Sequence, residues 1–105
     1  MYIGKVEVNN QWQQLDTLIQ AQVSGQSSFA FDADTTYQLQ GEGNNGVRLC
    51  VAASIPNDDE QVGFRIQGTQ CADFKAEAGC NLYAKAEKGA NPATPLLHIS
   101  TLGED

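Results

Sequence analysis

The sequence predicts one all-β domain, an antiparallel sandwich or barrel, from two observations. Short runs of alternating apolar and polar residues recur along the chain, with clusters of Gly, Asn, Asp and Ser between them about every eight to twelve residues. The composition is 41% hydrophobic and only 18% charged, and the abundant uncharged polar residues suit sheet surfaces better than exposed helix faces. No alternation of strands with helices indicates a parallel sheet.

The length of 105 residues predicts a single domain over residues 1–105. A chain of this length buries roughly two-thirds of its unfolded surface, so we expect it to fold without a metal ion or a disulfide. Its three cysteines, an odd number without a CxxC spacing, fit a reducing compartment. The first residues alternate and lack the basic start and apolar run of a signal peptide, so export by that route is not expected.

The charge balance argues against two classes of partner. The net charge is −7, and only six Lys and Arg are available for contacts with phosphate groups, so binding to nucleic acid is not expected. The same sign argues against an anionic membrane surface. No run approaches the roughly eighteen apolar residues that a membrane-spanning helix needs.

Residues 37–53 are the central feature of the predicted fold, a hairpin of two alternating arms. The expected core positions are Tyr37 and Leu39 on the first arm and Val47, Leu49, Val51 and Ala53 on the second. The Asn45-Gly46 pair, with two glycines before it, supplies the positive φ angles that a hairpin turn requires.

Further strands are expected on either side of this hairpin, over residues 2–8, 28–31, 64–66 and 97–101. The expected core side of residues 2–8 consists of Tyr2, Val6 and Val8. Residues 71–85 predict a second hairpin that turns at Glu77-Ala78-Gly79. The core side of this second hairpin and its continuation consists of Ala72, Phe74, Ala76, Leu82, Ala84 and Ala86. Residues 55–60 and 88–95 are loops by composition.

Residues 12–23 fit two structures. Trp12, Leu15, Leu18 and Ile19 follow helical spacing, whereas Ile19, Ala21 and Val23 alternate as in a strand. We expect a briefly helical start that becomes a strand near Ile19.

The cysteines and the single histidine contain the ligand types of a zinc site, namely Cys50, Cys71, Cys80 and His98. Structural zinc sites usually begin with two ligands roughly two to four residues apart, a spacing that is missing here, so separate half-buried thiols are favoured. A Cys71–Cys80 disulfide and a nucleophilic Cys–His pair remain as alternatives. No GxSxG, HExxH or P-loop motif is present.

Two groups of acidic residues offer oxygen ligands for Ca²⁺. One consists of Asp58, Asp59 and Glu60, and the other of Asp32 and Asp34. Neither has ligands at alternate positions ending in a bidentate Glu, so a solvated loop and an Asx-turn are the favoured interpretations. Trp12 and Tyr83 are candidates for a carbohydrate platform, although core packing is the commoner role of such rings. No catalytic, cofactor-binding or metal-binding residue is therefore predicted.

A resemblance covers residues 12–99. Its residues are Trp12, Leu15 and Leu18, then Phe29 and Phe31, Tyr37-Gln38-Leu39-Gln40, Val47 to Val51, Pro56, Gly63 with Ile66, and Asn81-Leu82-Tyr83-Ala84-Lys85-Ala86 before a last strand. This order resembles small jelly-roll-like β-sandwich proteins from the structural modules of tailed bacteriophages and prophages. The implied fold is a jelly-roll-like antiparallel sandwich of about eight or nine short strands with at most one short helix.

The resemblance implies a non-enzymatic virion protein, a capsid decoration or cement protein or a tail or connector component. Such a protein acts by contacts with other virion proteins, assembles in the host cytoplasm as a homo-oligomer, with a trimer favoured, and needs no cofactor. The alternative is a carbohydrate-binding attachment module of a tail fibre. A further alternative is a small cytoplasmic enzyme that uses a cysteine with His98.

Overall fold

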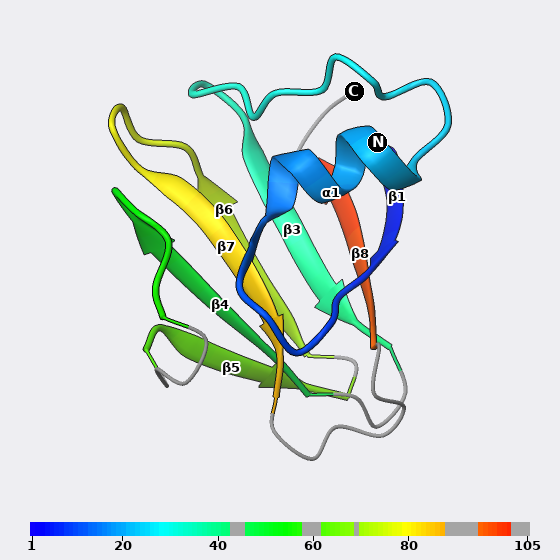
Figure 1. Cartoon of the computed structure of the whole chain (residues 1–105). Coiled ribbons are helices and arrows are strands. Elements are labelled where there is room, and N and C mark those ends of the chain that lie inside the picture. The colour runs from blue at the N-terminus through cyan, green and yellow to red at the C-terminus, as the bar shows by residue number, and fades with distance from the viewer. Residues whose placement is uncertain (43–45, 58–61, 69, 88–94, 102–105) are drawn as a thin grey trace.

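The computed structural model describes residues 1–42, 46–57, 62–68, 70–87 and 95–101, and it contains two four-stranded antiparallel sheets and one short helix (Figure 1). The elements in chain order are β1 (Tyr2–Glu7), β2 (Gln13–Gln14), α1 (Leu15–Gln22), β3 (Thr36–Gly41), β4 (Gly46–Ala52), β5 (Phe64–Gln67), β6 (Cys71–Lys75), β7 (Asn81–Ala86) and β8 (Leu96–Thr101). The first sheet has the order β1-β8-β3-β6 and the second sheet the order β2-β7-β4-β5.

The strand pairing is that of a jelly roll. β1 pairs with β8, β2 with β7, β3 with β6 and β4 with β5, so the first half of the chain pairs in nested order with the second half. Pairing of β3 with β8 and of β4 with β7 then completes the two sheets. A double-sheet jelly roll consists of eight strands in two Greek keys. The predicted antiparallel sandwich with at most one short helix is therefore confirmed.

Both predicted hairpins are wrong, although their strands exist. β3 lies in the first sheet and β4 in the second, and the same separation divides β6 from β7. Alternation shows which side chains face a core but not whether the neighbouring arm lies beside the strand or across the core from it. Asn45, in the first predicted turn, lies outside the described residues. The second predicted turn is present, because the amide of Cys80 donates to the carbonyl of Glu77 over 3.2 Å.

The core fills the space between the two sheets. Its fully buried side chains include Val6, Val8, Leu39, Val47, Leu49, Ala84, Leu97 and Ile99. Full burial of a Val, Leu or Ile side chain stabilises the fold by about 1.5–3 kcal/mol relative to exposure. The predicted core faces are confirmed at most of these strands. Val51 at the end of β4 is 43% exposed and Ala53 beyond the strand is also exposed, so the core positions predicted for these two residues are wrong.

Tyr2 is a second departure from the predicted core face. The register of β1 against β8 shifts between Tyr2 and Gly4, so Tyr2 lies opposite Ser100 while Gly4 lies opposite Ile99. A bulge of this kind turns one side chain to the other face of a strand. Tyr2 is therefore 58% exposed on the outer face, and its predicted place in the core is wrong.

Helix α1 replaces the strand that was expected near Ile19. Leu15, Leu18 and Ile19 are buried, so the helical spacing was correct for these three residues, whereas Trp12 precedes the short strand β2 and belongs to a separate cluster. The amide of Val23 still donates to the carbonyl of Ile19, and the helix ends there because Val23 is extended. Among the described residues, no helix has the length and hydrophobicity to span a membrane.

The side chain of Gln22 at the end of α1 blocks the outer edge of β1. Its amide oxygen accepts from the Glu7 N–H at 2.8 Å, and its amide nitrogen donates to the Glu7 carbonyl at 3.1 Å. These are the two hydrogen bonds that another strand would make with this residue. α1 therefore protects this edge from pairing with another chain.

Residues 29–33 are not a strand, in contrast to the prediction for residues 28–31. Phe31 nevertheless packs edge-on against Tyr37 at 4.9 Å and against Phe74 at 5.0 Å between ring centroids. The predicted Asx-turn follows, since Asp32 Oδ1 accepts from the Asp34 amide at 2.9 Å. This segment therefore closes one end of the sandwich with aromatic contacts instead of ladder hydrogen bonds.

Candidate functional site

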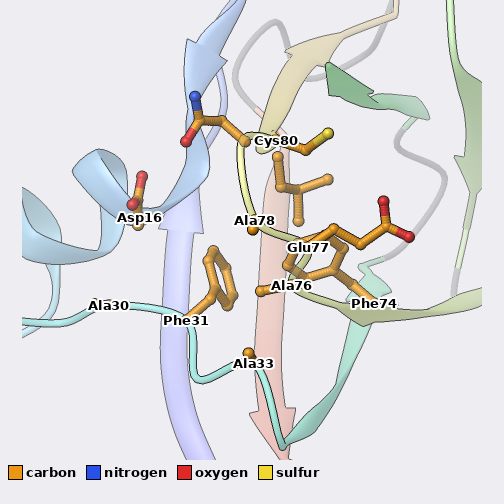
Figure 2. A pocket seen from close by; sticks show the side chains of 11 residues that line it. Asp16, Ala30, Phe31, Ala33, Phe74, Ala76, Glu77, Ala78 and Cys80 are labelled. Carbon is orange, nitrogen blue, oxygen red and sulfur yellow. The ribbon is translucent and has the colours of Figure 1, made fainter. Parts of the chain in front are cut away.

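A pocket of about 310 Å³ opens between the start of α1, the segment 30–33 and the connection from β6 to β7 (Figure 2). The lining residues are Asp16, Ala30, Phe31, Ala33, Phe74, Ala76, Glu77, Ala78, Cys80, Asn81 and Leu82. The volume lies near the lower end of the roughly 300–1,000 Å³ range of ligand pockets. The pocket is a concave candidate site in the described part of the chain.

The interior of the pocket is apolar. Phe74 and Leu82 are buried, and the half-buried ring of Phe31 forms one side (Figure 2). Four alanines around these larger side chains leave space that longer side chains would fill. A cavity with an aromatic wall therefore forms beside the turn that connects β6 of the first sheet to β7 of the second sheet.

The charged groups of the pocket are both acidic. Figure 2 shows Asp16 and Glu77 on opposite sides of Phe31. Asp16 lies in the first turn of α1, where the helix dipole favours a negative charge, and its Oδ1 accepts from the Thr17 amide at 2.9 Å. None of the described residues that line the pocket is Lys, Arg or His. The pocket therefore carries a negative potential.

An apolar strip runs across the inner face of the second sheet from the buried pocket residue Leu82 to the exposed Val51 and Phe64. Leu82, a pocket residue, lies opposite Val51 in the ladder of β7 and β4. Phe64 lies opposite Leu49, one diagonal step from Val51 on the same face. Phe64 is 45% exposed, so the inner face of the second sheet is uncovered at this end. We call Leu82, Val51 and Phe64 the apolar strip.

The two edges of the sandwich differ. β5 and β6, which follow one another in the chain, are the outer strands of the two sheets on one side, and each pairs with one described strand only. On the other side, Gln22 occupies the edge of β1. Edge strands are ready sites for pairing with another chain, so β5 and β6 form the open edge of this molecule.

The outer face of the second sheet holds a small second core of Trp12, Cys50 and Tyr83, with Val62 packed against it. Trp12 is 2% exposed and Tyr83 is also buried. A carbohydrate platform needs an exposed ring, so these two residues do not form the candidate platform, and the favoured interpretation, core packing, is confirmed. The rings do lie together, and the Lys85 ammonium lies 5.8 Å from the centre of the Trp12 ring.

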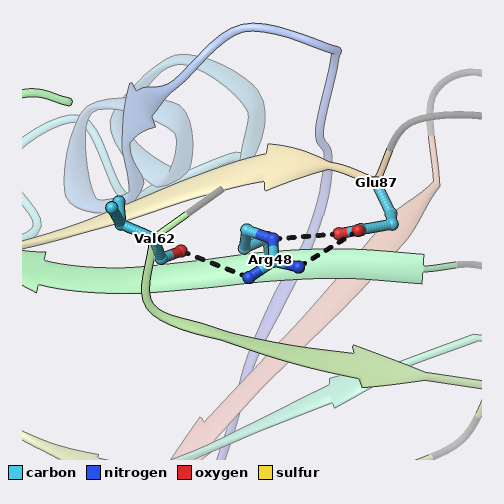
Figure 3. Close-up of polar contacts among 3 residues, drawn as sticks. All are labelled: Arg48, Val62 and Glu87. Carbon is cyan, nitrogen blue, oxygen red and sulfur yellow. Dashed lines mark hydrogen bonds and ion pairs between the residues drawn. The ribbon is translucent and has the colours of Figure 1, made fainter. Parts of the chain in front are cut away.

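The Arg48 side chain links Glu87, which follows β7, to Val62, which precedes β5, beside this second core. Its Nε donates to Glu87 Oε2 at 3.1 Å and its Nη2 to Oε1 at 3.2 Å, a bidentate pair (Figure 3). Its Nη1 donates to the carbonyl of Val62 at 3.5 Å. The next residue, Gly63, has φ +80°, and a Cβ there would overlap the carbonyl oxygen of Leu49. This close approach explains why glycine occupies position 63.

The three cysteines lie at separate places. Cys50 is in the second core, Cys71 is on the outer face of β6 and Cys80 lines the pocket. None of them forms a disulfide in the described structure, so separate thiols are confirmed over the Cys71–Cys80 alternative. No group of three or more His, Cys, Asp or Glu among the described residues is arranged to hold a metal ion.

His98 lies on the outer face of the first sheet between two polar partners. Its Nε2 is 2.8 Å from Glu42 Oε2 and its Nδ1 is 2.9 Å from the Tyr2 hydroxyl. Gln40 of β3 separates it from Cys71 in the ladder, which corresponds to about 10 Å for two strand spacings. His98 therefore does not activate Cys71, and its contacts with Glu42 and Tyr2 had no signal in the sequence.

The predicted acidic loops give no cation site in the described residues. Asp32 and Asp34 are used in the Asx-turn. Asp58, Asp59 and Glu60 lie outside the described residues. The pocket was not predicted either, because its lining comes from three segments that are distant in sequence.

Comparison with known proteins identifies no relative: no family model matches the chain, and no match was found among curated proteins or solved structures. The resemblance to bacteriophage structural proteins therefore stays a prediction. The fold and the candidate sites rest on the structure itself.

Proposed function

We propose that the protein is a non-enzymatic structural protein of a tailed-phage virion, a capsid decoration or tail component that acts by protein–protein contacts. The observation that carries the proposal is the apolar strip beside the open edge. Val51 and Phe64 are large apolar side chains on an inner sheet face, and both are more than two-fifths exposed, at 43% and 45%. Exposed apolar patches next to an open edge are typical of surfaces that another protein covers.

The partner in this proposal is a second copy of the chain. Virion parts occupy symmetric rings and lattices, so they form symmetric homo-oligomers. A trimer requires the strip of one copy to meet a different surface of the next copy, whereas contact between two strips closes as a dimer. We expect the trimer. The jelly-roll fold occurs in viral capsid domains but also in lectins and cupins, so fold alone supports this function only by analogy.

The first test is the solution mass of the pure protein, measured by light scattering over a dilution series from micromolar to nanomolar. We expect three copies for the unmodified chain. Phe64→Gln should lower the mass to that of one copy, because it places an amide in the strip. Tyr2→Gln is the matched control, since Tyr2 is an exposed aromatic residue on the outer face of the first sheet. It should leave the mass unchanged.

Other outcomes of this measurement have equally definite meanings. A monomer at every concentration would refute the homo-oligomer. A dimer would retain self-association but refute the trimer. Loss of association in both variants would refute the assignment of the contact to the strip.

The virion assignment has its own test. Particles released from induced cells that encode the chain should be purified on a density gradient and analysed by mass spectrometry. The chain should co-purify with the capsid or tail proteins in a fixed stoichiometry. Its complete absence from intact particles would refute a role in the mature virion.

A further inference from the structure

We propose that the pocket binds a small organic cation with a single aromatic ring, such as an arylalkyl ammonium ion. The proposal is independent of the proposed assembly function, because it rests on the lining of the pocket and not on the open edge. It joins three properties of one cavity: its volume, its aromatic wall and its charge.

The volume limits the ligand to a small molecule. At about 310 Å³ the pocket lies near the lower end of the range of known ligand sites, so one ring with a short chain is the appropriate size. The buried side chains of Phe74 and Leu82 form an apolar surface against which such a ring can pack. Phe31 lines the same cavity and stands edge-on to Phe74 at 5.0 Å between centroids, so aromatic rings already pack at this wall.

The charge selects a cation. Figure 2 shows Asp16 on one side of Phe31 and Glu77 on the other, with the Glu77 carboxylate directed away from Phe31, and none of the described lining residues is Lys, Arg or His. A ring held against Phe31 can therefore direct an ammonium group towards a carboxylate, and the aromatic face itself attracts a cation. An anionic ligand would meet the two carboxylates and the −7 net charge of the chain without a compensating group in the described lining.

The cation is complementary to these groups in its hydrogen bonding as well as in its charge. A carboxylate accepts hydrogen bonds only, and an ammonium group donates three. Asn81 also lines the cavity, but its side-chain amide is already used, since its oxygen accepts from Gln14 at 3.4 Å and its nitrogen donates to the Tyr83 hydroxyl at 3.4 Å. The ammonium group is therefore assigned to the carboxylates and the ring to the buried apolar side chains.

The test is a titration of the isotope-labelled full chain with four probes, followed by two-dimensional amide NMR. Phenethylamine carries both the ring and the cation, 2-phenylethanol lacks the charge, 3-phenylpropionate reverses it, and n-butylamine lacks the ring. We expect phenethylamine to shift the resonances of Phe31, Phe74 and Leu82 in a saturable manner. 2-Phenylethanol should bind about tenfold more weakly, which corresponds to about 1.4 kcal/mol. The other two should show no saturable shift there.

Three variants locate the binding site. Asp16→Asn should weaken phenethylamine binding about fivefold or more and leave 2-phenylethanol unaffected, because only the charge is lost. The amide of Asn retains an oxygen that can accept from Thr17, so the start of α1 is kept. Asp73→Asn is the matched control, since this carboxylate lies exposed on β6 and outside the pocket lining. Ala78→Leu fills the exposed rim and should abolish binding of both aromatic probes.

The proposal is overturned by any of four results. These are no saturable shift with phenethylamine at millimolar concentration, equal affinity for the cationic and neutral probes, tighter binding of 3-phenylpropionate, or shifts centred on the outer face of a sheet. An equal loss of affinity in Asp16→Asn and Asp73→Asn would refute the pocket as the origin of the selectivity. Assembly of the chain is measured separately by its mass, so failure of one proposal leaves the other to its own test.

Discussion

Replacement of Leu49 by alanine should destabilise the fold by about 3–4 kcal/mol. Leu49 is fully buried on the inner face of β4, opposite Ala84 on one side and Phe64 on the other. The change removes about three methylene equivalents, worth ~2.4 kcal/mol at ~0.8 kcal/mol each. A residual cavity adds to this, because neighbouring strands on both sides hold the backbone in place and Ala84 is too small to fill the space.

The assay is urea denaturation followed by tryptophan fluorescence, at one protein concentration for all variants. Trp12 is the only tryptophan and is buried, so its emission reports the loss of packing. The matched control is Val51→Ala on the same strand, which should cost less than about 1 kcal/mol because Val51 is largely exposed. A loss below about 0.5 kcal/mol for Leu49→Ala, or equal losses for the two variants, would show that the inner face of β4 is wrongly assigned.

Three further predictions concern the outer surfaces. Gly63→Ala should cost about 2–4 kcal/mol in the same urea assay, because its φ of +80° disfavours a side chain and the added Cβ meets the backbone of β4; a neutral result would refute the close approach. Glu87→Gln should cost about 1–2 kcal/mol, since the half-buried Arg48 guanidinium loses its charged partner, and an unchanged midpoint would show that the pair is not formed in solution. A maleimide reagent should label Cys71, which is exposed, much faster than the buried Cys50, as measured by peptide mass spectrometry; equal rates in the folded protein would contradict the second core.

Much of the fold follows from alternation along the strands. The buried positions of β3 and β8 were predicted correctly because the interior of a sandwich requires apolar side chains at every second residue. On β7 the inner face was predicted correctly, but Tyr83 and Lys85 on its outer face are buried as well. The partner of each strand was not predictable in the same way. Tyr37 and Leu49 face the same core from opposite sheets. If their two strands were paired in one sheet instead, the alternation of apolar and polar residues would be the same. Local features also overrode the pattern at Tyr2, where a bulge reverses the side chain.

The candidate site was less predictable than the fold. Phe74 had been assigned to a core face and Phe31 to a strand, and the two rings pack together. Their place at the wall of a pocket was not predictable, because the other lining residues, such as Asp16 and Glu77, come from segments that are distant in sequence. No sequence motif marks such a site, because its specificity comes from residues of distant segments that line one cavity. The second core is similar, since a lone Trp12 gives no indication of which face of which sheet it will cover.

The contact of Gln22 with Glu7 has a consequence for the behaviour of the protein at high concentration. A β-sheet grows into a fibre only if each added molecule offers a joinable strand on both sides, so that one attachment creates the place for the next. In the first sheet, the Gln22 side chain already fills the hydrogen-bonding positions of Glu7. A strand that paired with β1 at Glu7 would have to displace the Gln22 side chain, whereas β6 offers its edge without such a step. The helix therefore disfavours the two-sided addition on which a fibre depends.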